Sequence, residues 1–74
     1  MKLNIKTLSG VQHSFNLEEN DKIEALKKMV EEKVGIPPIQ QRLVLNGKIL
    51  PDDKTAKELN LKAGATIQLI LQLK

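Results

Sequence analysis

Apolar and polar residues alternate in two neighbouring segments near the start of the chain, residues 1–6 and 11–17. Alternation of this kind is typical of a β-strand that buries one face and exposes the other. Residues 8–10, Leu-Ser-Gly, separate the two segments and have the composition of a turn. The pattern therefore predicts an N-terminal β-hairpin whose inner face carries Met1, Leu3, Ile5, Val11, His13, Phe15 and Leu17.

The period changes to that of a helix between Asp21 and Gly35. Apolar side chains recur there at helical spacing, which predicts one amphipathic helix of about three to four turns. Asp21 is the predicted N-cap, and Gly35 supplies the left-handed residue that closes a helix. The outer face of this helix is predicted to carry Lys27, Lys28, Glu31 and Glu32.

The second half of the chain returns to strand patterns. Asn46-Gly47 lies between two apolar runs, which is the strongest short-range signal for a two-residue hairpin turn. Alternation over residues 67–73 predicts a last strand, and the capping-box spacing of Thr55 and Glu58 predicts a short helical turn before it. One helix and five strands in this order predict an α+β fold, with a mixed sheet and the main helix packed on one face.

Length and composition restrict the class of protein. With 74 residues, the chain is predicted to form a single domain over residues 1–74. It contains no cysteine, and its net charge of +3 suits acidic partners without requiring nucleic acid. Phe15 is the only aromatic residue, so stacking on exposed bases is not expected. We expect a monomer of the cytoplasm and nucleus that binds neither nucleic acid nor membranes.

Residues that could support catalysis are few and scattered. Ser9 and Ser14 have no base at a recognisable spacing, and His13 lies at an inward position of a predicted strand. The chain has no glycine-rich phosphate loop, and its adjacent carboxylates fall in segments with surface composition. The sequence therefore predicts neither an enzyme nor a metal or cofactor site.

Residues 35–48, GIPPIQQRLVLNGK, resemble the ubiquitin family. The resemblance is carried by Gly35, Ile36, Pro37, Pro38, Gln40, Gln41, Arg42, Leu43, Gly47 and Lys48. It implies the β-grasp fold, in which the first and last strands pair directly. It also implies that the chain acts by binding proteins: ubiquitin-binding domains or proteasome receptors, and activating and conjugating enzymes if a Gly-Gly tail is present.

Three apolar residues fall outside the predicted core. Ile70 and Val44 lie on the outward side of their strands, and Leu8 lies at the tip of a turn. Taken alone, they would be scattered surface residues of the kind that most proteins carry. The resemblance implies instead that they belong to one protein-binding patch, composed of Leu8, Arg42, Val44, Lys48, Gln68 and Ile70.

The end of the chain carries further candidate sites. A second apolar patch of the family corresponds to Ile36, Leu71 and Leu73, although packing at strand ends explains these residues equally well. Gln72 occupies the position at which, by the resemblance, activating enzymes discriminate between modifiers. The resemblance also implies acceptor lysines for chain building, with Lys48 the first candidate among Lys6, Lys27, Lys33 and Lys48.

Two branches of the family and one alternative are open on the sequence. Lys22, Lys54 and the run Glu31-Glu32-Lys33 resemble the Rub-type modifiers attached to cullins more than ubiquitin itself. Conjugated members carry Gly-Gly after the position of Lys74, where this sequence stops. We predict a ubiquitin-like modifier attached to target lysines through such a tail. The alternative is a non-conjugated ubiquitin-like domain of a proteasome shuttle or scaffold that binds ubiquitin receptors non-covalently.

Overall fold

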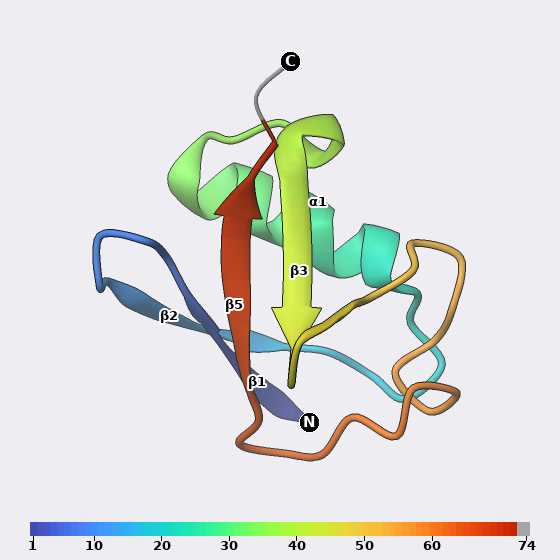
Figure 1. Cartoon of the computed structure of the whole chain (residues 1–74). Helices are drawn as coiled ribbons and strands as arrows, with labels where there is room; N and C mark the ends of the chain where they lie inside the picture. The colour runs from blue at the N-terminus through green and yellow to red at the C-terminus, as the bar shows by residue number, and fades with distance from the viewer. Residues whose placement is uncertain (73–74) are drawn as a thin grey trace.

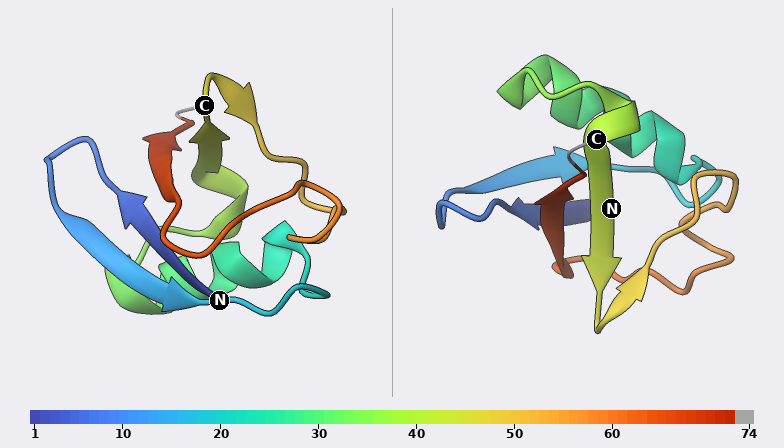
Figure 2. Two further views of the ribbon diagram at one scale, coloured as in Figure 1. Left: turned by 90° about the horizontal axis from the view of Figure 1, so that it is seen from below. Right: turned by 45° about the horizontal axis from the view of Figure 1, so that its top comes forward.

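The computed structural model describes residues 1–72, in which helix α1 lies across one face of a mixed sheet (Figures 1 and 2). The elements are β1 (Lys2–Lys6), β2 (Gln12–Asn16), α1 (Ile23–Val34), the 3-10 helix η1 (Pro38–Gln40), β3 (Gln41–Leu45), β4 (Lys48–Ile49) and β5 (Thr66–Leu71). The five strands have the order β2-β1-β5-β3-β4. Strands β1 and β5 pair in parallel at the centre of the sheet, and the other pairs are antiparallel. The predicted β-grasp fold is confirmed.

The core forms between the inner face of the sheet and the apolar stripe of α1. Its fully buried members include Leu3, Ile5, Leu17, Ile23, Leu26, Val30, Leu43, Ile67 and Leu69. The predicted strand registers are therefore confirmed at the centre of the sheet. Val11 and Leu71 also lie on the inner face, although they are 49% and 42% exposed. Both lie at strand ends, where they line an open hollow instead of the sealed core.

The predicted tight turn joins β3 to β4. Asn46 and Gly47 have φ angles of 53° and 79°, so both occupy the left-handed region that a type I′ turn requires. Leu45 and Lys48 flank the turn as a directly paired couple. The turn therefore fixes which residues of β3 and β4 share a face of the sheet.

The start of α1 differs from the prediction. The helix begins at Ile23, and Asp21 makes no capping bond to it. Backbone carbonyls of the loop after β4 satisfy the first free N–H groups: the N–H of Ile23 donates to Lys54 at 3.0 Å, and that of Glu24 to Asp52 at 3.2 Å. Because a distant loop replaces the side-chain cap, this helix start could not be found from local sequence.

The end of α1 agrees with the prediction. Gly35 has a φ of 80°, and its N–H donates to the carbonyl of Glu31 at 2.7 Å. We expect Gly35→Ala to lower the free energy of unfolding by about 1–2 kcal/mol, because an L side chain is strained in this conformation. A Cβ at this position would have no atom within 4 Å, so the cost is conformational. Urea unfolding measures this change in the free energy of unfolding. An alanine variant as stable as the parent would contradict the expectation, and Gly35→Asn should be less destabilising than Gly35→Ala.

The predicted capping box at Thr55 and Glu58 is present. The N–H of Thr55 donates to Oε1 of Glu58 at 3.0 Å, and the N–H of Glu58 donates to Oγ1 of Thr55 at 3.1 Å. Residues 56–60 form hydrogen-bonded turns, and the short helix of the described chain lies instead at Pro38–Gln40. The box closes the loop that caps α1, since Thr55 also pairs with Lys22 in an isolated bridge.

The pKa of Glu58 is lowered, first by the backbone hydrogen bond from Thr55 and then by that residue's hydroxyl. Because the folded pKa lies below the unfolded one, this carboxylate stabilises the fold above its ordinary pKa of 4.5 and loses that effect as the pH falls through the folded value. We expect Glu58→Gln to be less stable than the parent at neutral pH, with a gap that closes in acid. Urea midpoints of both proteins measured across pH test this expectation, and a difference in stability that stayed constant with pH would contradict it.

Candidate protein-binding site

The pairing of β3 with β5 brings four candidate residues together on the outer face of the sheet. Arg42 lies directly opposite Ile70, and Val44 lies directly opposite Gln68. Residues paired in this way share a face and lie within side-chain contact range. Their neighbours Leu43 and Leu69 are buried on the other face. We call the outer cluster of Arg42, Val44, Gln68 and Ile70 the β3–β5 patch.

The β3–β5 patch combines half-buried aliphatic groups with exposed polar ones. Val44 and Ile70 are half-buried, whereas Arg42 and Gln68 are exposed. Ile49 of β4 pairs with Val44 and is 55% exposed, so it extends the apolar surface to the edge of the sheet. The sequence analysis missed Ile49, although its place in the strand after the Asn-Gly turn was a usable signal. The arrangement can bury aliphatic groups of a partner beside a cation and an amide.

The charge of the outer face is positive. No residue of the five strands is Asp or Glu. Besides Arg42, the outer face carries Lys6, which pairs with Gln68, and Lys2 on the same strand. The carboxylates of the chain lie in α1 and the loops. A partner with acidic groups around an apolar centre would complement this face.

Leu8 and Lys48, the two other predicted members of the patch, lie outside the paired segments of β3 and β5, in the turn after β1 and in β4. Because β1 and β5 run in parallel, the turn after β1 and the last residues of β5 lie toward the same end of the sheet. Leu8, which is 70% exposed, therefore lines a hollow with Leu71. Lys48 pairs with Leu45, so its side chain leaves edge strand β4 on the face opposite to Val44, and it is exposed.

The hollow at this end of the sheet contains two of the three residues of the predicted second apolar patch. It has a volume of about 410 Å³, and its walls include Leu8, Val11, His13, Val34, Ile36 and Leu71. We call it the apolar hollow. Leu73, the third predicted residue, lies outside the described residues. Ile36 and Leu71 thus line an open surface and do not only pack at strand ends.

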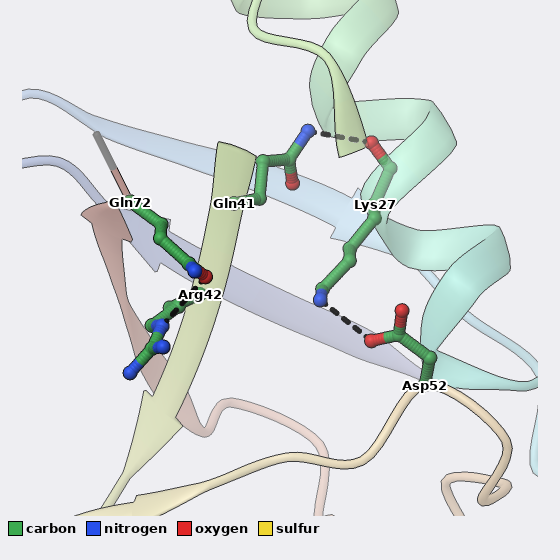
Figure 3. A network of polar contacts seen from close by, with 5 residues as sticks. All are labelled: Lys27, Gln41, Arg42, Asp52 and Gln72. Atoms are coloured by element: carbon green, nitrogen blue, oxygen red, sulfur yellow. Dashed lines mark hydrogen bonds and ion pairs between the residues drawn. The ribbon is translucent and has the colours of Figure 1, made fainter. Parts of the chain in front are cut away.

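Gln72 is held at the end of the sheet by two hydrogen bonds, of which Figure 3 shows the one with Arg42. Nε of Arg42 donates to Oε1 of Gln72 at 2.8 Å, and the backbone N–H of Gln72 donates to the carbonyl of Gln40 at 2.7 Å. Both side chains are exposed. A partner that approaches this end of the sheet therefore meets the amide of Gln72 in a defined orientation.

Gln41 ties the start of β3 to α1 and was not identified from the sequence as a buried residue. It is 2% exposed, and its Nε2 donates to the carbonyls of Lys27 at 2.9 Å and Ile36 at 2.8 Å (Figure 3). The alternation of β3 contained the signal, because Gln41 lies two positions before the buried Leu43. These bonds fix the position of β3, and hence that of Arg42 beside it.

The prediction that Lys27 lies on the exposed face of α1 is wrong. Lys27 is 6% exposed, and its Nζ forms an ion pair with Oδ1 of Asp52 at 2.5 Å (Figure 3). Lys27 lies four positions after Ile23 and three positions before Val30, so its aliphatic stem lies at the border of the apolar stripe. The other candidate acceptor lysines, Lys6, Lys33 and Lys48, are exposed.

Residues 1–72 contain no group of three His, Cys, Asp or Glu side chains placed to hold a metal ion. Over the same residues, no helix combines the length and the apolar character needed to cross a membrane.

Comparison with known proteins agrees with the fold described above. The family model described as "Ubiquitin family" matches residues 3–74. The chain is 46% identical to "NEDD8-like protein RUB3" of Arabidopsis thaliana and 43% identical to "Ubiquitin-like protein NEDD8" of Dictyostelium discoideum, in each case over 74 residues, all of this chain and 95% or 96% of the relative. It is also 33% identical over 72 residues to "Ubiquitin-like protein 4A" of Xenopus tropicalis, a match to 97% of this chain and 49% of that protein.

Proposed function

The chain belongs to the ubiquitin family, and from this we propose that it acts as a ubiquitin-like modifier of the Rub type. In this proposal it is joined to lysines of target proteins through a C-terminal Gly-Gly tail and is then recognised through the β3–β5 patch. It acts in the cytoplasm and nucleus and catalyses no reaction itself. Two relatives named for NEDD8 support the proposal, because they align with this chain over nearly their whole length.

The β3–β5 patch is the observation that supports recognition. Val44 and Ile70 lie on adjacent strands of the outer face, and Ile49 extends this apolar surface within surroundings that include Arg42, Lys6 and Gln68. A small apolar area supports only modest affinity, on the order of micromolar dissociation or about −8 kcal/mol. Such affinity suits a tag that is read together with the protein to which it is attached, because tethering raises the effective concentration. The proposed partners are ubiquitin-binding domains and proteasome receptors.

The end of the sheet supports the proposed role in activation. Gln72 is exposed, and its side chain is oriented by Arg42. A residue held in this way can be read by an activating enzyme that approaches along the C-terminal strand. If further copies are added, Lys6, Lys33 and Lys48 are the better acceptors, because Lys27 is buried in its ion pair.

The experiment that tests the modifier proposal begins with the residues that follow Lys74 in the gene product. The product, processed to its mature end, is incubated with ATP and a Rub-type or a ubiquitin-type activating enzyme. We expect a thioester with the Rub-type enzyme that is cleaved by reducing agent. Gln72→Arg should shift the preference toward the ubiquitin-type enzyme. A chain that continues into further domains and forms no thioester would refute the proposal.

That negative result would support the second candidate function, a non-conjugated domain of a shuttle or scaffold protein. The observation in its favour is the match to "Ubiquitin-like protein 4A", of which the chain covers only 49%. Such a domain would use the β3–β5 patch to bind ubiquitin receptors without covalent attachment. Loss of receptor binding on Ile70→Asp is expected under both functions, so only the thioester assay separates them.

A further inference from the structure

The exposed large aliphatic side chains of the described residues fall into two separate groups. Leu8, Val11 and Leu71 line the apolar hollow. Ile39 and Ile49 line a different hollow, of about 380 Å³, between η1 and β4. We call it the η1–β4 hollow, and its walls also include Pro38, Gln41, Arg42, Pro51 and Gln72.

Ile39 is 86% exposed, more than Ile49, and its backbone is held in a defined turn. It lies in η1 beside Pro38, and the N–H of Gln40 closes this turn on the carbonyl of Pro37 at 3.0 Å. Proline restricts the backbone of this turn, so little backbone entropy is lost when Ile39 is covered. Isolated exposed aliphatic residues are ordinary, but two that line one hollow form a surface that gains by being covered.

Two cationic residues, Lys27 and Arg42, and one carboxylate, Asp52, line the η1–β4 hollow, for a net charge of +1. Lys27 lines it, but its ammonium is paired with Asp52. The guanidinium of Arg42 donates through Nε to the neutral amide of Gln72 and has no carboxylate partner within residues 1–72. Within residues 1–72, Arg42 is therefore a cation without a carboxylate partner beside two aliphatic side chains. The complementary ligand carries a carboxylate next to an aliphatic group.

The position of the η1–β4 hollow indicates the shape of its ligand. Strand β4 is the last strand of the sheet, so its outer edge has no neighbouring strand among the described residues. An extended peptide can lie along such an edge and place alternate side chains into an adjacent hollow. A volume of about 380 Å³ suits one or two side chains and not a folded domain.

We propose that the η1–β4 hollow binds a short extended segment of a partner protein in which an aliphatic residue adjoins an Asp or Glu. The aliphatic side chain packs between Ile39 and Ile49, and the carboxylate pairs with Arg42. This surface is additional to the β3–β5 patch. The two share a border at Arg42 and Ile49, but Val44 and Ile70 do not line the hollow and Ile39 is not in the patch.

The test is an NMR titration of the isotope-labelled chain with a blocked peptide, Glu-Asp-Leu-Ile-Asp-Glu. Two control peptides replace either its aliphatic residues by Ser or its acidic residues by Lys. We expect saturable shifts at Ile39, Ile49 and Gln72 with the first peptide only. Ile39→Asp should weaken binding about tenfold or more, since it removes an aliphatic contact and repels the carboxylates. Leu8→Asp is the matched control, because Leu8 is similarly exposed but lines the apolar hollow.

Binding that survives in Leu8→Asp but is lost in Ile39→Asp supports the inference and is independent of the modifier proposal. Shifts confined to the β3–β5 patch, or equal affinity of Ile39→Asp and the parent, would overturn it. So would the absence of saturation at millimolar peptide. If the same residues shift on dilution without peptide, the occupant is a second copy of the chain, which also overturns the inference.

Discussion

Ile70→Asp is expected to weaken binding to ubiquitin-binding domains by about thirtyfold or more, the effect of losing an interface residue worth at least 2 kcal/mol. Ile70 is one of the two aliphatic members of the β3–β5 patch, so a carboxylate there would be buried against the apolar surface of the partner. The fold should persist, because the new carboxylate would lie directly opposite Arg42 on the neighbouring strand. Calorimetric titration measures the affinity, and circular dichroism checks the fold.

Thr66→Asp is the matched control for Ile70→Asp. Thr66 is exposed on the same strand and the same face, four positions before Ile70, and it pairs with Asn4 of β1 and not with β3. It adds the same charge outside the β3–β5 patch, so we expect it to bind nearly as well as the parent. Equal loss in both variants would mean that charge alone, and not the apolar contact, explains the effect.

Lys27→Ala is expected to lower the free energy of unfolding by about 3 kcal/mol, a cost typical of truncating a long buried side chain. Lys27 is 6% exposed, and its ammonium joins α1 to the loop of Asp52, whose backbone also caps the helix. Most of the loss should come from the stem, because Asp52 is 57% exposed and remains solvated. Urea unfolding of the purified variants measures the change.

Two further variants separate the causes of that loss. Lys27→Met keeps a packed stem without the charge, so we expect a loss of about 1 kcal/mol. Lys28→Ala, at the next and exposed position of α1, should change stability by less than about 0.5 kcal/mol. If Lys27→Ala were no more destabilising than Lys28→Ala, burial of the stem would not be what stabilises this contact.

The sequence was sufficient wherever the signal was local. Alternation placed Leu3, Ile67 and Leu69 inward, and Gly35 and the Asn46-Gly47 turn have the left-handed backbone expected of them. With these turns fixed, the residues that share the outer face of β3 follow from the period of the strand. The four members of the β3–β5 patch were therefore predictable, and their adjacency needed only the pairing of β3 with β5.

The sequence was insufficient where distant segments compete with local preference. Asp21 is a good cap by type, but carbonyls of the loop after β4 satisfy the start of α1. Lys27 is charged, yet its position at the border of the apolar stripe and the nearby Asp52 allow it to be buried. Leu8 could not be placed by spacing, because the parallel pairing of β1 with β5 decides which end of the sheet the turn after β1 occupies, and there Leu8 lines a hollow with Leu71.

The most direct test of recognition through the β3–β5 patch is an NMR titration of the isotope-labelled chain with an unlabelled ubiquitin-binding domain. We expect saturable shifts that centre on Arg42, Val44, Gln68 and Ile70 and disappear in Ile70→Asp. Two results would contradict the claim that this chain is recognised through the outer face of β3 and β5. In the first, the resonances of these residues do not shift; in the second, the domain binds Ile70→Asp as tightly as the parent.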